Sequence, residues 1–176
     1  MRKLILILSS FLLFTSANIV LPGDGEEANA KIKAIYIYNF TKYIEWPDAY
    51  KEGSFVIGFI GKNTALLTEL SKMADSKKAG NQNIEIRNIS TLDDNSKYNI
   101  VFLLSENSSQ LSEVVTKAKG KSTLIVTEKE GLAAKGAAIN FIVEENKQKI
   151  ELNKANIEKY KLKVADNLVK MSKQVN

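Results

Sequence analysis

Two pairs of acidic residues have the spacing best suited to chemistry in this sequence. Asp93 and Asp94 are adjacent, and Glu128 and Glu130 flank Lys129. Both pairs fall near the ends of strand-like segments, where paired carboxylates can bind a metal ion or act as acid and base. Adjacent acids in loops are more often turn and cap residues. Catalysis or metal binding by these pairs is therefore the alternative interpretation.

Histidine and cysteine are both absent from the 176 residues. Their absence removes the usual ligands of zinc and copper and the two commonest catalytic side chains. It also excludes disulfides and the lipidated cysteine of a bacterial lipoprotein. We therefore expect a protein that is not an enzyme, with no catalytic residues, no metal site and no cofactor.

Two further patterns suggest ligands but fit them poorly. Residues 61–64, Gly-Lys-Asn-Thr, follow an apolar run, yet a phosphate loop needs its first glycine five residues before the second and Lys-Ser/Thr directly after it. Lysines 72, 77 and 78 are interleaved with Glu69 and Asp75, which is typical of a solvated mixed-charge surface. We expect neither phosphate nor nucleic acid to bind.

Aromatic residues are concentrated in one segment and predict a partner-binding surface. Tyr38 points away from the apolar side of a predicted helix, and Trp46, Pro47 and Tyr50 follow in a turn. Tryptophan and tyrosine are over-represented as interface anchors. Two alternatives remain open: Trp46 packs onto the end of the sheet, or another helix covers Tyr38.

These residues must be positioned by alternating helices and strands. Residues 31–44 have a helical period that predicts a buried face; it comprises Ile32, Ile35, Tyr36, Phe40, Tyr43 and Ile44. Strand patterns fall at residues 55–60, 84–89, 98–104 and 123–127, and helical patterns at 65–74 and 108–119. Such alternation predicts an α/β fold of three layers, with a mostly parallel mixed sheet and helices on both faces.

The C-terminal part predicts a β-hairpin followed by a helix. Residues 137–144 and 147–152 flank the turn Glu145-Asn146, and Asn153 can cap one last helix with residues from Ile157 to Ser172 on its inner face. Asn140 lies inside an apolar strand and needs a hydrogen-bond partner if it is buried. We expect that partner in the loop at residues 131–136.

The N-terminus predicts export. Arg2 and Lys3 precede apolar runs at residues 4–8 and 11–14, and Thr15 and Ala17 have the spacing of a cleavage site. We therefore expect a signal peptide at residues 1–17, a linker at 18–29 and one α/β domain at 30–176. Cleavage lowers the formal charge from +5 to +3, since it removes two cations and no acid. The alternative is a membrane anchor, but the apolar stretch is shorter than the ~20 residues that span a bilayer.

The assembled pattern resembles the YfiR family. The segments that carry the resemblance are residues 34–47, 55–61, 131–141, 150–153 and 162–168, and the resemblance covers about residues 30–175. It implies a periplasmic α/β protein that often forms dimers and regulates without catalysis; the best-known members restrain a membrane-bound diguanylate cyclase. Characterised members use cysteine pairs, so redox control of that kind does not carry over to this cysteine-free chain.

We therefore expect a periplasmic regulatory or sensor domain that binds a membrane signalling protein and forms a homodimer. The partner could be a diguanylate cyclase, a histidine kinase or an outer-membrane receptor, and cyclic-di-GMP signalling would be the output in the first case. After signal cleavage we expect no stable membrane insertion. The alternative function is that of a periplasmic small-ligand-binding protein or weak hydrolase.

Overall fold

The structure is a computed structural model that describes residues 24–62, 64–93 and 95–176. The expected signal peptide, the first part of the expected linker, Asn63 and Asp94 lie outside the described residues. Among the described residues, no helix has the length and apolar character needed to cross a membrane.

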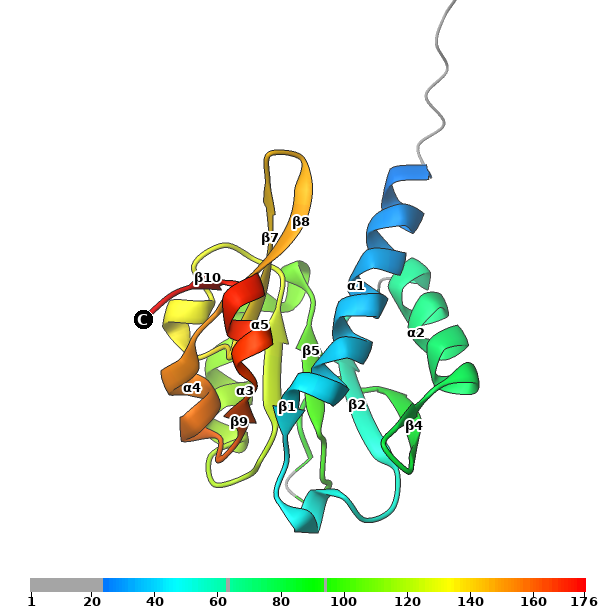
Figure 1. The fold of residues 1–176 in the computed structure, drawn as a ribbon, viewed down its shortest axis with the longest axis vertical. Coiled ribbons are helices and arrows are strands. Elements are labelled where there is room, and N and C mark those ends of the chain that lie inside the picture. The colour runs from blue at the N-terminus through cyan, green and yellow to red at the C-terminus, as the bar shows by residue number, and fades with distance from the viewer. Residues whose placement is uncertain (1–23, 63, 94) are drawn as a thin grey trace, which may run out of the picture.

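The centre of the fold is an eight-stranded mixed sheet (Figure 1). The strands are β2 (Phe55–Ile60), β3 (Lys78–Ala79), β4 (Gln82–Asn88), β5 (Ile100–Leu103), β6 (Leu124–Thr127), β7 (Ile139–Glu144), β8 (Lys147–Leu152) and β10 (Lys173–Gln174). Their spatial order is β10-β8-β7-β6-β5-β2-β4-β3. Within this eight-stranded sheet, the β7–β8 and β3–β4 pairs are antiparallel and the other five pairs are parallel, so the predicted mostly parallel mixed sheet is confirmed.

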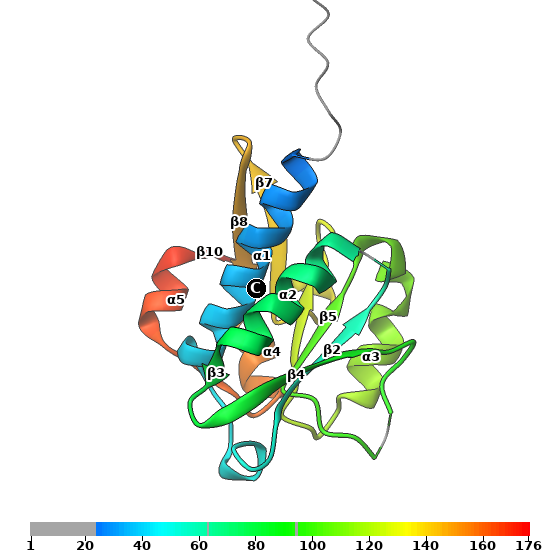
Figure 2. The same ribbon diagram turned by 90° about the vertical axis from the view of Figure 1, so that its right-hand side faces the viewer.

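Helices cover both faces of this sheet, as predicted (Figures 1 and 2). Helices α1 (Asp24–Tyr43) and α2 (Thr64–Ser76) lie together on one face, and α3 (Leu111–Lys117) and α4 (Lys154–Lys159) lie on the other. The crossovers β2-α2-β4 and β5-α3-β6 run in opposite directions across the sheet, so the right-handed rule places α2 and α3 on opposite faces.

The core lies on both sides of the central strands. Every residue of β2, β5 and β6 is buried, which explains their continuous apolar runs. On the side of α1, the rings of Tyr36 and Phe40 contact Phe141 with centroids 5.7 and 6.2 Å away. The predicted grouping of Tyr36 with Phe40 on the inner side of the helix is confirmed.

The hairpin is also confirmed. Glu145 and Asn146 have φ angles of 53° and 58°, the left-handed pair of a two-residue hairpin turn. The tip of the β7–β8 hairpin projects beyond the other strands (Figure 1).

Helix α1 begins earlier than the sequence indicated. It starts at Asp24, so residues 24–29 of the expected linker are helical. Glu26 and Glu27 lie in the first turn, where negative charge is favourable beside the positive end of the helix dipole. The buried face also differs, because Ala30, Ala34, Ile37 and Phe40 are buried while Ile32 and Ile35 are exposed.

The prediction of one continuous last helix was wrong. Asn153 does cap α4, its side chain accepting a hydrogen bond from the Asn156 N–H at 3.0 Å. The helix then ends because Lys161 takes a left-handed φ of 56°, and the chain forms β9 (Lys163–Val164), α5 (Asp166–Met171) and β10. Strand β9 pairs with β1 (Ile44–Glu45), directly after the first helix.

Because the last segment is not one helix, the residues expected on its inner face are not all buried. Ile157, Tyr160 and Leu168 are buried, whereas 57% of Met171 is exposed. The expected helix at residues 108–119 is likewise divided, since its first part is a 3-10 helix (Ser105–Gln110) that leads into α3.

Candidate functional site

Trp46 lies at the edge of the sheet where the parallel strands begin. Only 5% of the residue is exposed, and its ring meets Phe55 edge to face with centroids 4.9 Å apart. The indole Nε1 donates to the backbone oxygen of Asn99 at 3.2 Å. The geometry therefore supports the alternative in which Trp46 packs onto the sheet end, while Pro47 beside it is exposed.

Tyr50 holds the same edge together. Its carbonyl accepts hydrogen bonds from Gln82 Nε2 (3.2 Å) and Asn99 Nδ2 (3.1 Å), and its hydroxyl accepts from the Ser122 N–H at 3.1 Å. Asn99 Oδ1 accepts in turn from the Val56 N–H at 2.9 Å. These bonds connect the starts of β2, β4, β5 and β6, so Trp46 and Tyr50 stabilise the domain. A partner-binding role for Trp46, Pro47 and Tyr50 stays a prediction.

Tyr38 lies elsewhere, on the outer side of α1 beside α2. It is half-buried, and Lys42 Nζ lies 4.4 Å from the centroid of its ring. Helix α2 covers α1 only in part: Ile32 and Ile35 remain 39% and 52% exposed. Tyr38 is thus covered in part by α2, as one alternative expected, and its role in partner binding stays a prediction.

A shallow groove runs between these two helices, with a volume of about 240 Å³. Its apolar wall is formed by Ala34, Ile35, Tyr38 and Met73. We call this wall, together with the adjacent Ile32, the α1–α2 face. The sequence predicted Tyr38 as a residue of the partner-binding surface. It did not predict Ile35, because the helical pattern assigned this isoleucine to the buried side of the helix. The pair Ala30 and Ala34, four residues apart, was the available signal for the true packing side.

Lysines surround the groove. Lys31, Lys72 and Lys77 line it, with Glu69 as the only acid among its lining residues. Glu69 accepts a hydrogen bond from Lys72 at 2.6 Å, and this bond raises the pKa of the lysine. The α1–α2 face therefore combines apolar surface with a positive rim.

The acid pairs are not brought together into one site. Asp93 accepts hydrogen bonds from the Asn95 N–H and the Ser96 hydroxyl, both at 2.9 Å, and these bonds lower its pKa. Such bonds are those of a turn residue, and Asp94 lies outside the described residues.

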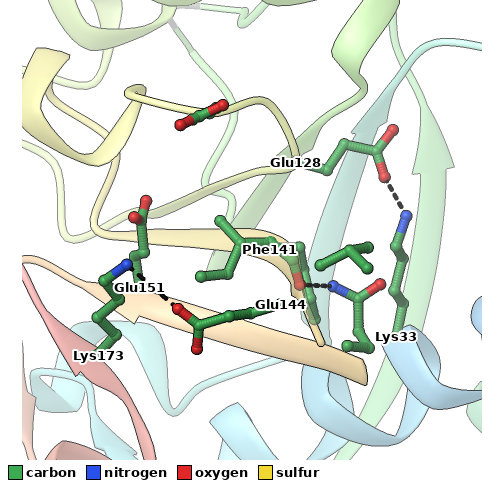
Figure 3. A pocket seen from close by; sticks show the side chains of 10 residues that line it. Lys33, Glu128, Phe141, Glu144, Glu151 and Lys173 are labelled. Atoms are coloured by element: carbon green, nitrogen blue, oxygen red, sulfur yellow. Dashed lines mark hydrogen bonds and ion pairs between the residues drawn. The ribbon is translucent and has the colours of Figure 1, made fainter. Parts of the chain in front are cut away.

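Glu128 and Glu130 line a pocket of about 330 Å³ between the middle of α1, at Lys33, and the β7–β8 hairpin (Figure 3). Glu128 accepts from Lys33 Nζ at 2.5 Å and from the Ser105 N–H at 3.1 Å. Both side chains of the Lys33–Glu128 pair are largely buried. This pair therefore connects α1 to the end of β6.

The other charges of this pocket are also partly neutralised (Figure 3). Glu144 lies 2.7 Å from Lys149 Nζ and 3.5 Å from Lys173 Nζ, and the hydrogen bond from Lys149 is the main reason that its pKa is lowered. Among the described residues, no group of three or more acidic side chains is placed to hold a metal ion.

Asn140 is fully buried beside this pocket, with partners other than the expected loop. Its Oδ1 accepts from the Thr127 hydroxyl at 2.7 Å, and its Nδ2 donates to Glu151 at 3.0 Å. The loop at residues 131–136 is bonded instead by Asn153 and Asn156, which both donate to the Ala133 carbonyl. The expectation failed because strand pairing places Asn140 beside Thr127.

The fold and these surfaces define a three-layer α/β domain whose exposed apolar groove lies between its first two helices. The family model described as YfiR/HmsC-like matches residues 30–173, and the chain belongs to this family. YfiR-like proteins are periplasmic regulators of diguanylate cyclases. A search of curated proteins returned no match.

Proposed function

We propose that this protein is an exported, non-enzymatic regulatory domain that binds a membrane signalling protein through the α1–α2 face. The observation that carries the proposal is the exposure of Ile32 and Ile35 beside an apolar groove. Contiguous exposed apolar surface with a polar rim is typical of protein-binding sites.

The family supports a diguanylate cyclase as the partner and the periplasm as the place of action. Tyr38 keeps its proposed role as a contact residue, since its ring lines the groove. Burial of one aliphatic or aromatic side chain contributes about 1.5–3 kcal/mol before ordering costs. Ile35 and Tyr38 together can therefore supply a large share of the affinity of a regulatory complex.

A matched pair of variants tests this proposal. Ile35→Glu places a charge in the centre of the α1–α2 face, and Met171→Glu places the same charge on α5 at a residue of similar exposure, 57% against 52%. Host cells that lack the native gene are supplied with each variant, and cellular cyclic-di-GMP is measured. Circular dichroism and export levels verify that both proteins fold.

We expect Ile35→Glu to give the cyclic-di-GMP level of cells without the gene, whereas Met171→Glu restores the wild-type level. Regulation by folded Ile35→Glu equal to that of the wild type would contradict the proposal. A homodimer is part of the same proposal, and sedimentation of the two variants determines whether self-association uses the α1–α2 face.

A further inference from the structure

A third hollow lies where the parallel strands end, at the opposite end of the sheet from Trp46. This cavity has a volume of about 590 Å³ and lies beside the last residues of β2 and β4 and the 3-10 helix that follows β5; the three neighbouring strands are labelled in Figure 2. The connection from β2 to β4 runs through α2 on one face of the sheet. The connection from β5 to β6 runs through α3 on the other face, in the opposite direction. Open α/β sheets bind ligands at such a divergence of connections.

The cavity has an apolar floor and polar walls. Ile60 and Ile89 provide the aliphatic surface. The polar side chains are those of Lys62, Asn88, Ser90, Glu106, Asn107 and Gln110. Three carboxamides, one hydroxyl, one ammonium and one carboxylate thus converge from three segments that are distant in sequence.

Gly61 shapes this cavity. Its φ angle is +136°, and a Cβ at this position would lie 2.2 Å from Leu104 Cδ1. The sharp turn brings the Lys62 N–H to Glu106, with a hydrogen bond of 3.2 Å. Within the described ranges, neither the Lys62 ammonium nor the Glu106 carboxylate forms an ion pair.

Asn107 adds an unusual feature. Its Oδ1 is buried and is the one buried side-chain polar atom of the described residues without a hydrogen-bond partner. The residue as a whole is only half-buried, and it lines the cavity. A buried acceptor without a partner is unfavourable, and a donor of a bound molecule that reaches this oxygen would remove that cost.

The charges and donors together select the ligand. The lining carries one positive and one negative charge, so it favours a neutral molecule, and the Glu106 carboxylate disfavours phosphate. A carboxamide offers a donor and an acceptor side by side, which matches adjacent hydroxyls that each donate and accept. We infer that this cavity binds a small neutral polyhydroxyl compound of the monosaccharide class. This site extends the proposed regulatory function and does not depend on it.

The test follows the amide resonances of the protein by NMR during titration with D-glucose, D-galactose and N-acetyl-D-glucosamine, each to millimolar concentration. Inorganic phosphate is titrated separately. Asn88→Ala removes one carboxamide from the cavity, and the matched control Asn83→Ala removes the same group from an exposed site at the other end of β4.

We expect at least one sugar to shift the side-chain amides of Asn88, Asn107 and Gln110. Asn88→Ala should weaken its binding about five-fold, the loss of about one neutral hydrogen bond, and Asn83→Ala should not. No shift with any of the sugars, a shift with phosphate alone, or equal affinities for the two variants overturns the inference. Ile35→Glu should bind the sugar like the wild type, so failure of this inference and failure of the proposed function are distinguishable.

Discussion

The replacement Trp46→Ala separates a structural tryptophan from an interface tryptophan. The indole is 95% buried, contacts Phe55 edge to face and donates a hydrogen bond to the Asn99 carbonyl. Truncation of a buried tryptophan costs about 3–5 kcal/mol because it removes apolar contacts and leaves a cavity. The Asn99 carbonyl still accepts from the Leu124 N–H at 2.8 Å, so the lost hydrogen bond adds little to this cost.

Urea unfolding followed by far-UV circular dichroism measures this cost. Fluorescence is unsuitable, since Trp46 is the single tryptophan. Trp46→Phe keeps a ring against Phe55 and loses the Nε1 donor, so we expect it to cost about 1–2 kcal/mol. Tyr38→Ala loses a half-exposed ring and its contact with Lys42, and should cost about 1 kcal/mol or less.

An interface tryptophan would behave in the opposite way, with weakened association and unchanged stability of the monomer. If the free energy of unfolding of Trp46→Ala is within 1 kcal/mol of the wild-type value, the assignment of Trp46 to the core is wrong. The order Trp46→Ala, Trp46→Phe, Tyr38→Ala in decreasing cost is the expected result.

Three further changes have definite expected outcomes. Gly61→Ala should lower the free energy of unfolding by about 2–4 kcal/mol, because the new methyl group meets Leu104 in a left-handed conformation; a urea midpoint equal to that of the wild type would show that the turn at this glycine can relax. The double change Glu145→Asn with Asn146→Gly should raise the free energy of unfolding by about 1 kcal/mol, since both positions have positive φ. A thermal midpoint below that of the wild type would contradict this. Burial raises the pKa of Tyr160 to about 12 from an ordinary value near 10, so the unfolded state releases this proton first and stability falls as pH rises from about 10 to 12. Tyr160→Phe should lack this part of the decline in urea midpoints, and an identical pH dependence would refute it.

Local patterns predicted the elements that are buried on both faces or built on a turn. The run at residues 55–60 is β2, residue for residue, because a central parallel strand needs apolar side chains on both sides. The pair Glu145-Asn146 was predictable because short hairpins admit few turn residues. Asn153 was predictable as a helix cap for the same local reason.

Features that depend on distant partners could not be predicted in this way. The apolar residues after Asn153 are compatible with one helix, and only the pairing of Val164 with Ile44 explains the strand that interrupts it. Trp46 had the chemistry of an interface anchor, but its burial depends on Phe55 and Asn99. The cavity beside Gly61 likewise needs Glu106 and Asn107, which lie more than forty residues away in sequence.

The pairing of β1 with β9 has a consequence for the order of folding. Ile44 and Val164 are 120 positions apart, so closing this ladder organises a long loop of chain. The end of α1 cannot acquire this strand partner until residue 164 has left the ribosome, and contacts of such separation slow folding. The ladder between the end of α1 and β9 therefore forms only after residue 164 has emerged, although β2 and the other central strands are synthesised earlier.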